Sequence, residues 1–291
     1  MRGAEGLMSS GLYGAIEAGG TKFLVAVGND PTHPMDVRRI PTSNYPQDTM
    51  AAVTAYFQEH APLEALAVAS FGPVDFDRRV IGKTPKLAWQ DFPIVDTLTG
   101  ALSVPVILET DVNAAAIGES RYGAGRGVGT FVYITVGTGI GGGAVIDGKT
   151  LHGLMHPEMG HLPLRRHPDD PSDFRGTCPF HGACLEGMAS GPAMGARWGQ
   201  PAEALPPGHP GWRIEAYYIA QACLSLACIL SPHRIVVGGG VFSNAAMYVL
   251  VNEELERLVN GYLPLPEVVP PELPLPALTG ALAIARSAVC R

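Results

Sequence analysis

Small and apolar residues alternate in two short runs near the start of the chain, YGAIEA (13–18) and TKFLVAVG (21–28), with two glycines between them. This pattern predicts a β-hairpin. We expect a third strand at 36–40, a helix over 47–60 and a buried strand over 63–70. The run VPVIL (104–108) predicts another buried strand, followed by an alanine-rich helix that begins at Asp111.

The same kinds of element recur in the second half of the chain. TFVYITVG and IGGGAVIDG, within 130–148, predict strand, glycine turn and strand, and PHRIVVGGGVFSN (232–244) predicts strand, glycine turn and helix. Two such halves indicate a duplicated α/β unit that clamps a ligand between its parts. We expect an N-terminal lobe over 1–123, rejoined by a C-terminal helix at 278–291, and a C-terminal lobe over 124–277. The boundary is expected near 123–129.

Two proline-rich stretches, 200–211 and 262–276, cannot be helix interior and predict surface connections. The most apolar segment, YYIAQACLSLACIL (217–230), is too short for a membrane span and is interrupted by Gln221 and Ser225. We therefore expect a buried helix there and no membrane partner.

Composition narrows the class of protein. With 291 residues, 46% of them hydrophobic, the chain can bury a large core. The net charge of −7, without a lysine–arginine run, argues against nucleic-acid binding. The first twelve residues lack the apolar stretch of a signal peptide, so a cytoplasmic protein is expected.

The five cysteines are an odd number, and in a reducing compartment closely spaced cysteines more often indicate a metal or catalysis than disulfides. His161, Cys178, His181 and Cys184 form a pattern that predicts a closed, tetrahedral Zn²⁺ site in a loop over 161–184. A cysteine-containing loop with unrelated histidines is the alternative. Three further histidines remain rival fourth ligands: His152, His156 and His167.

Three glycine turns could approach phosphate groups closely and donate backbone N–H groups to them. They lie at 19–22, 137–139 and 238–240. Each alone also fits an ordinary tight turn. Their recurrence favours a nucleotide, although no P-loop sequence or well-placed dinucleotide fingerprint is present.

Three carboxylates are candidates for chemistry. Asp111 stands between a strand and a helix, where it could cap the helix or act as a base at the edge of a sheet. Glu158 and Glu186 are close in sequence to predicted metal ligands. They are either solvated surface residues or, held beside a metal, groups that bind hydroxyls of a polar substrate.

Seven motifs in this order resemble the ROK family of sugar kinases and sugar-responsive repressors, from Tyr13 to Ala288. They are EAGGTKF, ASFGPVD, ETDVNAAAIGE, TVGTGIGGG, HPEMGH, CPFHGACLEG and VVGGGV. Within the family the resemblance is to bacterial fructokinases. It implies an α/β, actin-like (ribonuclease H-like) fold of two lobes, with ATP, Mg²⁺ and a sugar meeting in an interlobe cleft and a structural Zn²⁺ beside the sugar.

The resemblance also assigns roles to residues. Asp111 matches the catalytic base, and His161 with its three partners matches the zinc site. The nucleotide loops correspond to Gly19, Gly20, Thr21, Lys22, Gly137, Thr138, Gly139, Gly239 and Gly240. The sugar-binding set is Gly72, Pro73, Asn113, Glu158 and Glu186.

Three residues depart from the common family motifs. His181 stands where a cysteine is usual, Thr110 replaces an asparagine that holds a pyranose hydroxyl in glucokinases, and Glu17 replaces an aspartate. The change at Thr110 fits a fructokinase that makes fructose 6-phosphate from D-fructose and ATP.

Other functions remain open at this point. The kinase could act on mannose, glucose or N-acetylmannosamine instead, and the protein could form a homodimer as family members often do. A sugar-sensing repressor would carry an N-terminal winged helix, for which only about a dozen residues precede the first strand. A non-catalytic sugar or zinc protein conflicts with the three glycine turns and Asp111.

Overall fold

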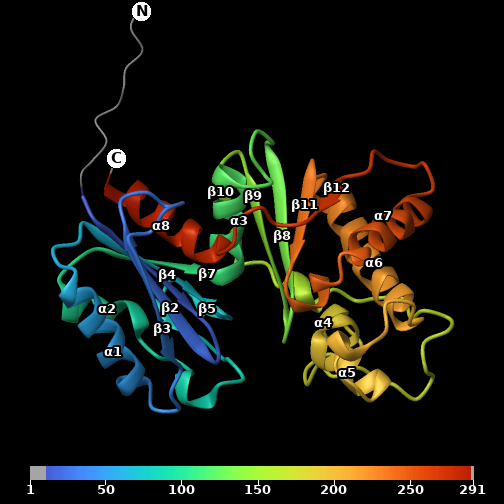
Figure 1. Cartoon of the computed structure of the whole chain (residues 1–291), viewed down its shortest axis with the longest axis horizontal. Helices are drawn as coiled ribbons and strands as arrows, with labels where there is room; N and C mark the ends of the chain where they lie inside the picture. Colours follow the sequence, from blue (N-terminus) through green and yellow to red (C-terminus); the bar gives the residue numbers. More distant parts are fainter. Residues whose placement is uncertain (1–10, 290–291) are drawn as a thin grey trace, which may run out of the picture. The chain divides into compact units, whose positions relative to one another are not determined.

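The computed structural model describes residues 11–289 of the chain (Figure 1). They form two compact units, one with the chain up to Gly118 and from Leu275 onward, the other from Glu119 to Pro274. The first crossing between the units lies inside helix α3 (Asp111–Tyr122), whereas the sequence pattern places it in the segment 123–129. The second crossing lies just before helix α8 (Pro276–Val289).

A five-stranded mixed sheet forms the centre of the first unit, in the order β3-β2-β1-β4-β7. Its strands are β1 (Tyr13–Ala18), β2 (Lys22–Gly28), β3 (Asp36–Pro41), β4 (Ala65–Ser70) and β7 (Val106–Thr110). The first three pair antiparallel, and β1, β4 and β7 run parallel. The predicted hairpin, the third strand and the buried strand over 63–70 are thus confirmed. The run 104–108 also ends in a strand, but Val106, Ile107 and Leu108 are only partly buried. A short pair, β5 (Val74–Asp75) and β6 (Val80–Ile81), follows β4.

The two faces of this sheet carry different side chains, because successive residues of a strand point to opposite sides. One face packs with α1 (Pro46–Glu59), α2 (Ile94–Leu102) and the 3₁₀ turn η1 (Leu87–Trp89) around large side chains. Phe23 and Trp89 meet there with ring centroids 5.2 Å apart. The other face is rich in alanine and packs against α8, whose red ribbon lies against the blue strands in Figure 1.

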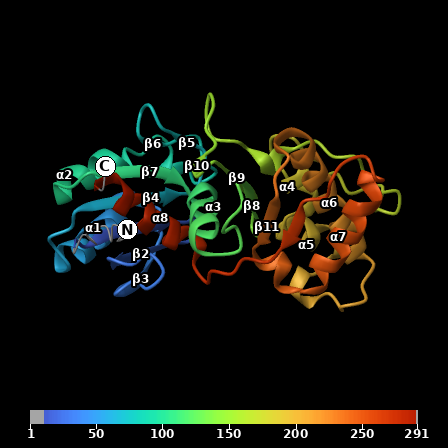
Figure 2. The same ribbon diagram turned by 90° about the horizontal axis from the view of Figure 1, so that it is seen from above.

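Helices α3 and α8 touch through their backbones, and both views of the molecule show them side by side (Figure 2). A Cβ atom at Gly280 would lie 1.7 Å from the carbonyl oxygen of Ala114, and one at Gly118 would lie 2.3 Å from that of Pro276. Only glycine fits at both positions. The C-terminal helix is therefore fixed closely against the helix that begins at Asp111.

The second unit repeats the sheet of the first, in the order β10-β9-β8-β11-β12. Its strands are β8 (Thr130–Val136), β9 (Ile140–Ile146), β10 (Lys149–Thr150), β11 (Arg234–Gly238) and β12 (Glu267–Val269). The antiparallel and parallel pairings follow the same sequence as in the first sheet. The predicted duplication of an α/β unit is confirmed at the level of topology.

Helices α6 (Gly211–Leu230) and α7 (Ala246–Val259) pack against each other in the second unit. Of the residues that the structure describes, only α6 forms a helix that by length and hydropathy could cross a membrane, and 61% of its apolar window is buried inside the protein. Tyr218 and Cys223, for example, have no exposed surface. The predicted buried helix is confirmed, although it begins at Gly211 rather than 217.

The second proline-rich stretch is not a simple surface connection, because it contributes the edge strand β12, parallel to β11. Glu119, fully buried, holds the chain just beyond this strand: its carboxylate accepts backbone N–H groups of Ala124, Glu272 and Leu273 at 2.7, 3.2 and 2.8 Å. The first stretch contains the 3₁₀ turn η3 (Ala202–Ala204). After β11 the chain forms the 3₁₀ turn η4 (Gly240–Ser243) before α7, where the sequence predicts a helix directly.

Candidate functional site

Three predicted site segments of the first unit follow parallel strands that end at the same level. Ala18, Ser70 and Thr110, the last residues of β1, β4 and β7, are register partners. The glycine turn, the Gly72–Pro73 segment and Asp111 come directly after them. The sheet therefore brings these segments to one edge, which is where open α/β sheets hold ligands.

Glycine is required by the turn at position 19 but not by packing at position 20. Gly19 donates its N–H to the carbonyl oxygen of Lys22 at 2.9 Å, and a Cβ atom at Gly19 would lie 2.8 Å from that oxygen. Turn geometry alone explains it. A Cβ atom at Gly20 would have no neighbour nearer than 3.9 Å, so packing does not require glycine there. Gly20 leaves its backbone accessible to a ligand, next to the exposed Thr21.

Thr110, not Asp111, caps helix α3. The Thr110 hydroxyl oxygen accepts the backbone N–H of Asn113 at 3.1 Å, which is the contact that an N-cap side chain makes with the third residue of a helix. Asp111 is the first helical residue, and its Oδ1 accepts the N–H of Val112 at 2.8 Å. The interpretation of Asp111 as the cap is therefore wrong. The Asp111 carboxylate is half-buried at the edge of the sheet.

Glu109 supports this turn from inside the protein. Its Oε1 accepts the backbone N–H of Thr110 and the side-chain N–H of Asn113, both at 2.9 Å. Asn113 has no exposed surface and ties the end of β7 to the start of α3. Its contact with a sugar stays a prediction. Gly72 and Pro73 are partly exposed, as a site in contact with a ligand requires.

The two glycine turns of the second unit also lie at one sheet edge, because β8 and β11 are parallel neighbours. Gly239 has a φ of +99°, and a Cβ atom there would lie 2.3 Å from the carbonyl oxygen of Val136, so the fold requires glycine at this position. Gly137 and Gly240 have open space where a Cβ atom would be. Their backbones, like that of Gly20, are free to approach a ligand.

The four predicted metal ligands come together in the second unit. One ligand atom from each of His161, Cys178, His181 and Cys184 lies within 4.8 Å of all the others. The sulfur atom of Cys178 is 3.8 Å from Nδ1 of each histidine, and that of Cys184 is 3.5 Å from Nδ1 of His161. Tetrahedral Zn²⁺ with Zn–S of about 2.3 Å and Zn–N of about 2.0 Å places sulfur and nitrogen roughly 3.6 Å apart. The donor set and its spacing fit Zn²⁺.

The rival histidines lie outside this group. His156 is buried, with its Nδ1 3.6 Å from the Glu158 carboxylate. The ring of His167 packs edge-on against Tyr217, and its Nδ1 accepts the backbone N–H of Asp169 at 3.1 Å. Among the described residues, the metal-ligand group contains none of the three rival histidines, His152, His156 and His167.

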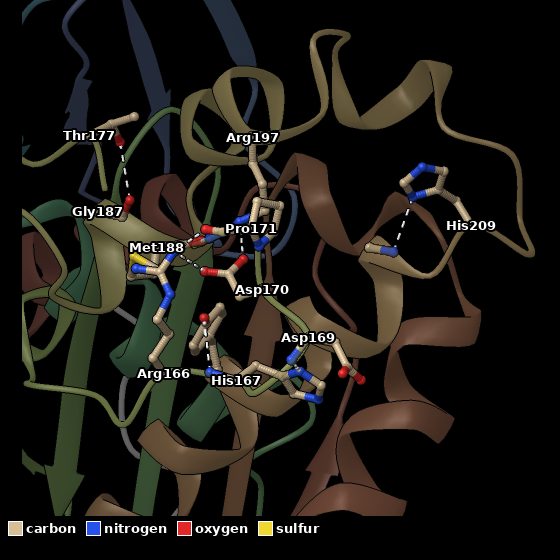
Figure 3. Close-up of polar contacts among 12 residues, drawn as sticks. Arg166, His167, Asp169, Asp170, Pro171, Thr177, Gly187, Met188, Arg197 and His209 are labelled. Carbon is tan, nitrogen blue, oxygen red and sulfur yellow. Dashed lines mark hydrogen bonds and ion pairs between the residues drawn. The ribbon is translucent and has the colours of Figure 1, made fainter. Parts of the chain in front are cut away.

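A buried ion pair anchors the middle of the loop that carries the metal ligands. Figure 3 shows Asp170 between two arginines: its Oδ1 is 2.7 Å from Nε of Arg197, on α5 (Gly191–Trp198), and its Oδ2 is 3.0 Å from Nη2 of Arg166. The side chains of Asp170 and Arg197 have no exposed surface. Arg197 also donates to the carbonyl oxygen of Met188 at 2.6 Å. The loop is thus fixed to the helices behind it independently of the metal ligands.

Glu215, on α6, adds a second acidic group to this cluster. It is fully buried, and neither carboxylate oxygen has a hydrogen-bond partner among the described residues. Burial raises the pKa of Glu215 well above the usual value, and the negative charge of Asp170 adds to the rise while Arg197 opposes it. Glu215 is accordingly the member of the cluster that is stable in its neutral form.

The two predicted sugar-binding glutamates lie near each other, on either side of the metal ligands in sequence. Burial raises the pKa of Glu158, and the charge of Glu186 raises it further. Glu186 lies on the short helix α4 (Leu185–Ala189), and its Oε2 accepts the backbone N–H of Ile140 at 2.9 Å. Glu186 therefore contacts the strand end beside the glycine turn 137–139, a contact that the sequence does not indicate.

A sequence profile described as "ROK family" matches residues 13–288. The chain belongs to the ROK family. Its relatives include the fructokinase of Zymomonas mobilis, 42% identical over 86% of this chain and 87% of the relative, and the fructokinase of Pediococcus pentosaceus, 40% identical over 89% of each chain. The crystal structure of a ROK glucokinase from Streptomyces griseus, in complex with glucose and AMPPNP, superimposes with a TM-score of 0.79. That protein is 25% identical and covers 95% of this chain and 100% of its own.

These comparisons confirm the family and the α/β, actin-like fold that the motifs indicate. The ROK motifs also explain which residues the sequence analysis finds and which it misses. Asp111 and the cysteines are identified as candidates within their motifs, whereas Glu109, the first residue of ETDVNAAAIGE, is not. Glu109 could have been found as the acidic residue four positions before Asn113 at a strand–helix junction. Asp170 and Arg197 have no local signal, because they are 27 positions apart and meet only in the folded unit.

Proposed function

We propose that this ROK protein is an ATP-dependent fructokinase, which transfers the γ-phosphoryl group of ATP to the 6-hydroxyl of D-fructose. The observation that carries the proposal is the 42% identity to a fructokinase over most of both chains, against 28% to a glucokinase. The sheet-edge position of Asp111, beside a glycine turn with open space at Gly20, supports the same chemistry.

Asp111 is the general base in this proposal. It accepts the proton of the fructose 6-hydroxyl while that oxygen forms a bond to the γ-phosphorus and the bond from the γ-phosphorus to the ADP oxygen breaks. Thr110 and Glu109 support Asp111 indirectly. Their side chains accept backbone N–H groups at the start of α3 and so fix the turn that carries Asp111. The glycine turns at 19–22, 137–139 and 239–240 donate N–H groups to the phosphates.

Mg²⁺ enters with ATP and neutralises phosphate charge during transfer. Apart from the cysteine–histidine group, no cluster of three or more potential metal ligands forms among residues 11–289. Glu17, near the carboxyl end of β1, is the carboxylate proposed to bind Mg²⁺.

Zn²⁺ is the metal proposed for His161, Cys178, His181 and Cys184, with a structural role, because four protein ligands leave no open position. It would hold Glu158 and Glu186 where they can bind fructose hydroxyls. Gly72 and Pro73 are the sugar-binding residues proposed in the first unit. The protein is proposed to work in the cytoplasm, where ATP is available and thiols stay reduced. A homodimer, and the absence of nucleic-acid partners, stay predictions.

The test is ADP release from MgATP with fructose, mannose, glucose and N-acetylmannosamine, with a control that contains no sugar. We expect strong preference for fructose in kcat/KM and little release without sugar. Turnover of another hexose in place of fructose would leave the kinase and change its substrate. No turnover with any of the four sugars would remove the proposal in favour of a sugar-sensing protein.

A further inference from the structure

Two short segments of the second unit hold Ile140, the first residue of β9 and the residue that follows the glycine turn 137–139. On one side, the Glu186 carboxylate accepts the Ile140 N–H at 2.9 Å. On the other side, Gly160 lies so close that a Cβ atom there would be 1.8 Å from the Ile140 carbonyl oxygen. The backbone of Ile140 is therefore fixed at both its N–H and its carbonyl group.

Each of these segments carries a metal ligand. Gly160 precedes His161 in the 3₁₀ turn η2 (Met159–His161), and Glu186 is two residues beyond Cys184. The segments are also joined directly, because the N–H of Leu185 donates to the carbonyl oxygen of Leu162 at 2.9 Å. Gly160 is directly adjacent to the metal ligand His161, and only Leu185 lies between Cys184 and Glu186. A movement of the metal ligands would therefore also move the two groups that contact Ile140.

The glycines around Ile140 fit this arrangement. A Cβ atom at Gly139 would lie 2.7 Å from Oε2 of Glu186, and one at Gly142 would lie 2.8 Å from Cβ of Met159. A side chain at position 142 would collide with Met159 close to its backbone, and one at position 139 would displace the Glu186 carboxylate. Gly137, in contrast, has open space, which leaves that part of the turn accessible. The turn thus has one side held by the segments and one side available to a ligand.

We infer that Glu186 is a positioning residue for the glycine turn 137–139, and that the metal site orders this turn through Glu186 and Gly160. The inference rests on the proposed function and deepens it. The metal cluster serves the nucleotide side of the reaction as well as the sugar side, because Ile140 connects the cluster to the turn that donates N–H groups to phosphate.

The experiment compares Glu186→Leu, which removes the acceptor, with Glu186→Gln, which keeps an acceptor oxygen at the same place. Hydrogen exchange of the Ile140 amide is measured in metal-loaded protein without ATP or sugar. We expect exchange to become at least about tenfold faster in Glu186→Leu and to stay near the wild-type rate in Glu186→Gln. Glu253→Leu, at an exposed position of α7, is the control and should leave the Ile140 amide unchanged.

ATP binding, measured by calorimetry without sugar, is the second readout. Glu186→Leu should weaken ATP binding and raise the KM for ATP, whereas Glu186→Gln should keep both. The KM for fructose should rise in both variants, because both lose the negative charge. This division separates the positioning role from contact with the sugar.

Metal removal from the wild-type protein is the third arm. Faster exchange of the Ile140 amide in verified metal-free, folded protein supports the inference, and an unchanged rate overturns it, even if Glu186→Leu does not fold. Wild-type exchange and ATP affinity in a folded Glu186→Leu variant would also overturn it. A wild-type protein that binds no adenine nucleotide would instead remove the proposed function, whatever the exchange rates are.

Discussion

The Thr110 hydroxyl oxygen accepts the backbone N–H of Asn113 at 3.1 Å, and this one contact separates two roles that the sequence leaves together at the start of α3. Thr110 caps the helix, so the cap and the proposed base are two different residues. Removing the cap and removing the base should therefore have different consequences.

Asp111→Asn should abolish most turnover while the fold survives. Asparagine keeps the shape of the side chain and an oxygen that can accept the Val112 N–H, but it cannot take a proton from the sugar. We expect kcat to fall by about 10² to 10⁴-fold, the usual contribution of a general base. Steady-state kinetics with fructose measures the loss, and thermal unfolding should stay close to wild type. Retained turnover would remove Asp111 from the mechanism.

Thr110→Ala should destabilise the protein by about 0.5–2 kcal/mol, because the N–H of Asn113 loses its acceptor. Thr110→Ser keeps the hydroxyl and should restore most of the stability. Urea unfolding of the three proteins measures the difference. Equal stability of the alanine and serine variants would contradict the cap.

Thr110→Asn should change the sugar preference without removing the cap, because asparagine is also a good N-cap residue. It reproduces the residue that stands at this position in glucokinases of the family. We expect the ratio of kcat/KM for glucose to that for fructose to rise, with unfolding near wild type. An unchanged ratio would show that Thr110 does not set the preference.

Loss of one metal ligand should release the metal and lower stability. We expect His181→Ala to bind less than one metal ion per chain and to unfold at a lower temperature, since binding energy at a structural site is folding energy. His181→Cys, which restores the usual family ligand, should keep about one zinc per chain by elemental analysis. Full metal content in His181→Ala would exclude His181 from the site.

Asp170→Asn should cost about 3–5 kcal/mol of unfolding free energy, because it leaves the buried Arg197 guanidinium without its partner charge. The matched control is Glu59→Gln, which breaks the exposed Arg38–Glu59 pair and should leave stability close to wild type, because solvent screens exposed charges. Denaturant titration of both variants measures the contrast. Similar small losses in the two variants would show that the buried pair does not hold the loop.

Glu215 should make the protein less stable as pH rises. Because its pKa is higher in the folded than in the unfolded protein, the folded state binds the proton more tightly, and this stabilisation is lost as pH rises from the unfolded pKa through the folded one. Glu215→Gln should remove that part of the pH dependence of stability. Its unfolding temperature relative to that of the wild type should therefore be highest at neutral and alkaline pH. Thermal unfolding between pH 4.5 and 8.5 tests this, and parallel curves for the two proteins would contradict it.

The sequence by itself determines the local structure around the candidate site. Alternation of small and apolar residues specifies the two hairpins, glycine marks the turns, and cysteine and histidine at close spacing specify the metal group, because each signal acts within a few residues. The motif order is also enough to indicate the family. The strand β12 escapes this kind of reasoning, because it is three residues long and prolines lie close on both sides.

Tertiary structure decides which of these local pieces meet. Sheet register brings Ala18, Ser70 and Thr110 to one level, although their segments are far apart in the chain. Packing decides that Asn113 is buried and bonded to Glu109. The contact between Glu186 and Ile140 joins residues 46 positions apart. Such contacts depend on how strands and helices pack. A local sequence pattern reflects only neighbours along the chain, so it does not predict which distant segments come into contact.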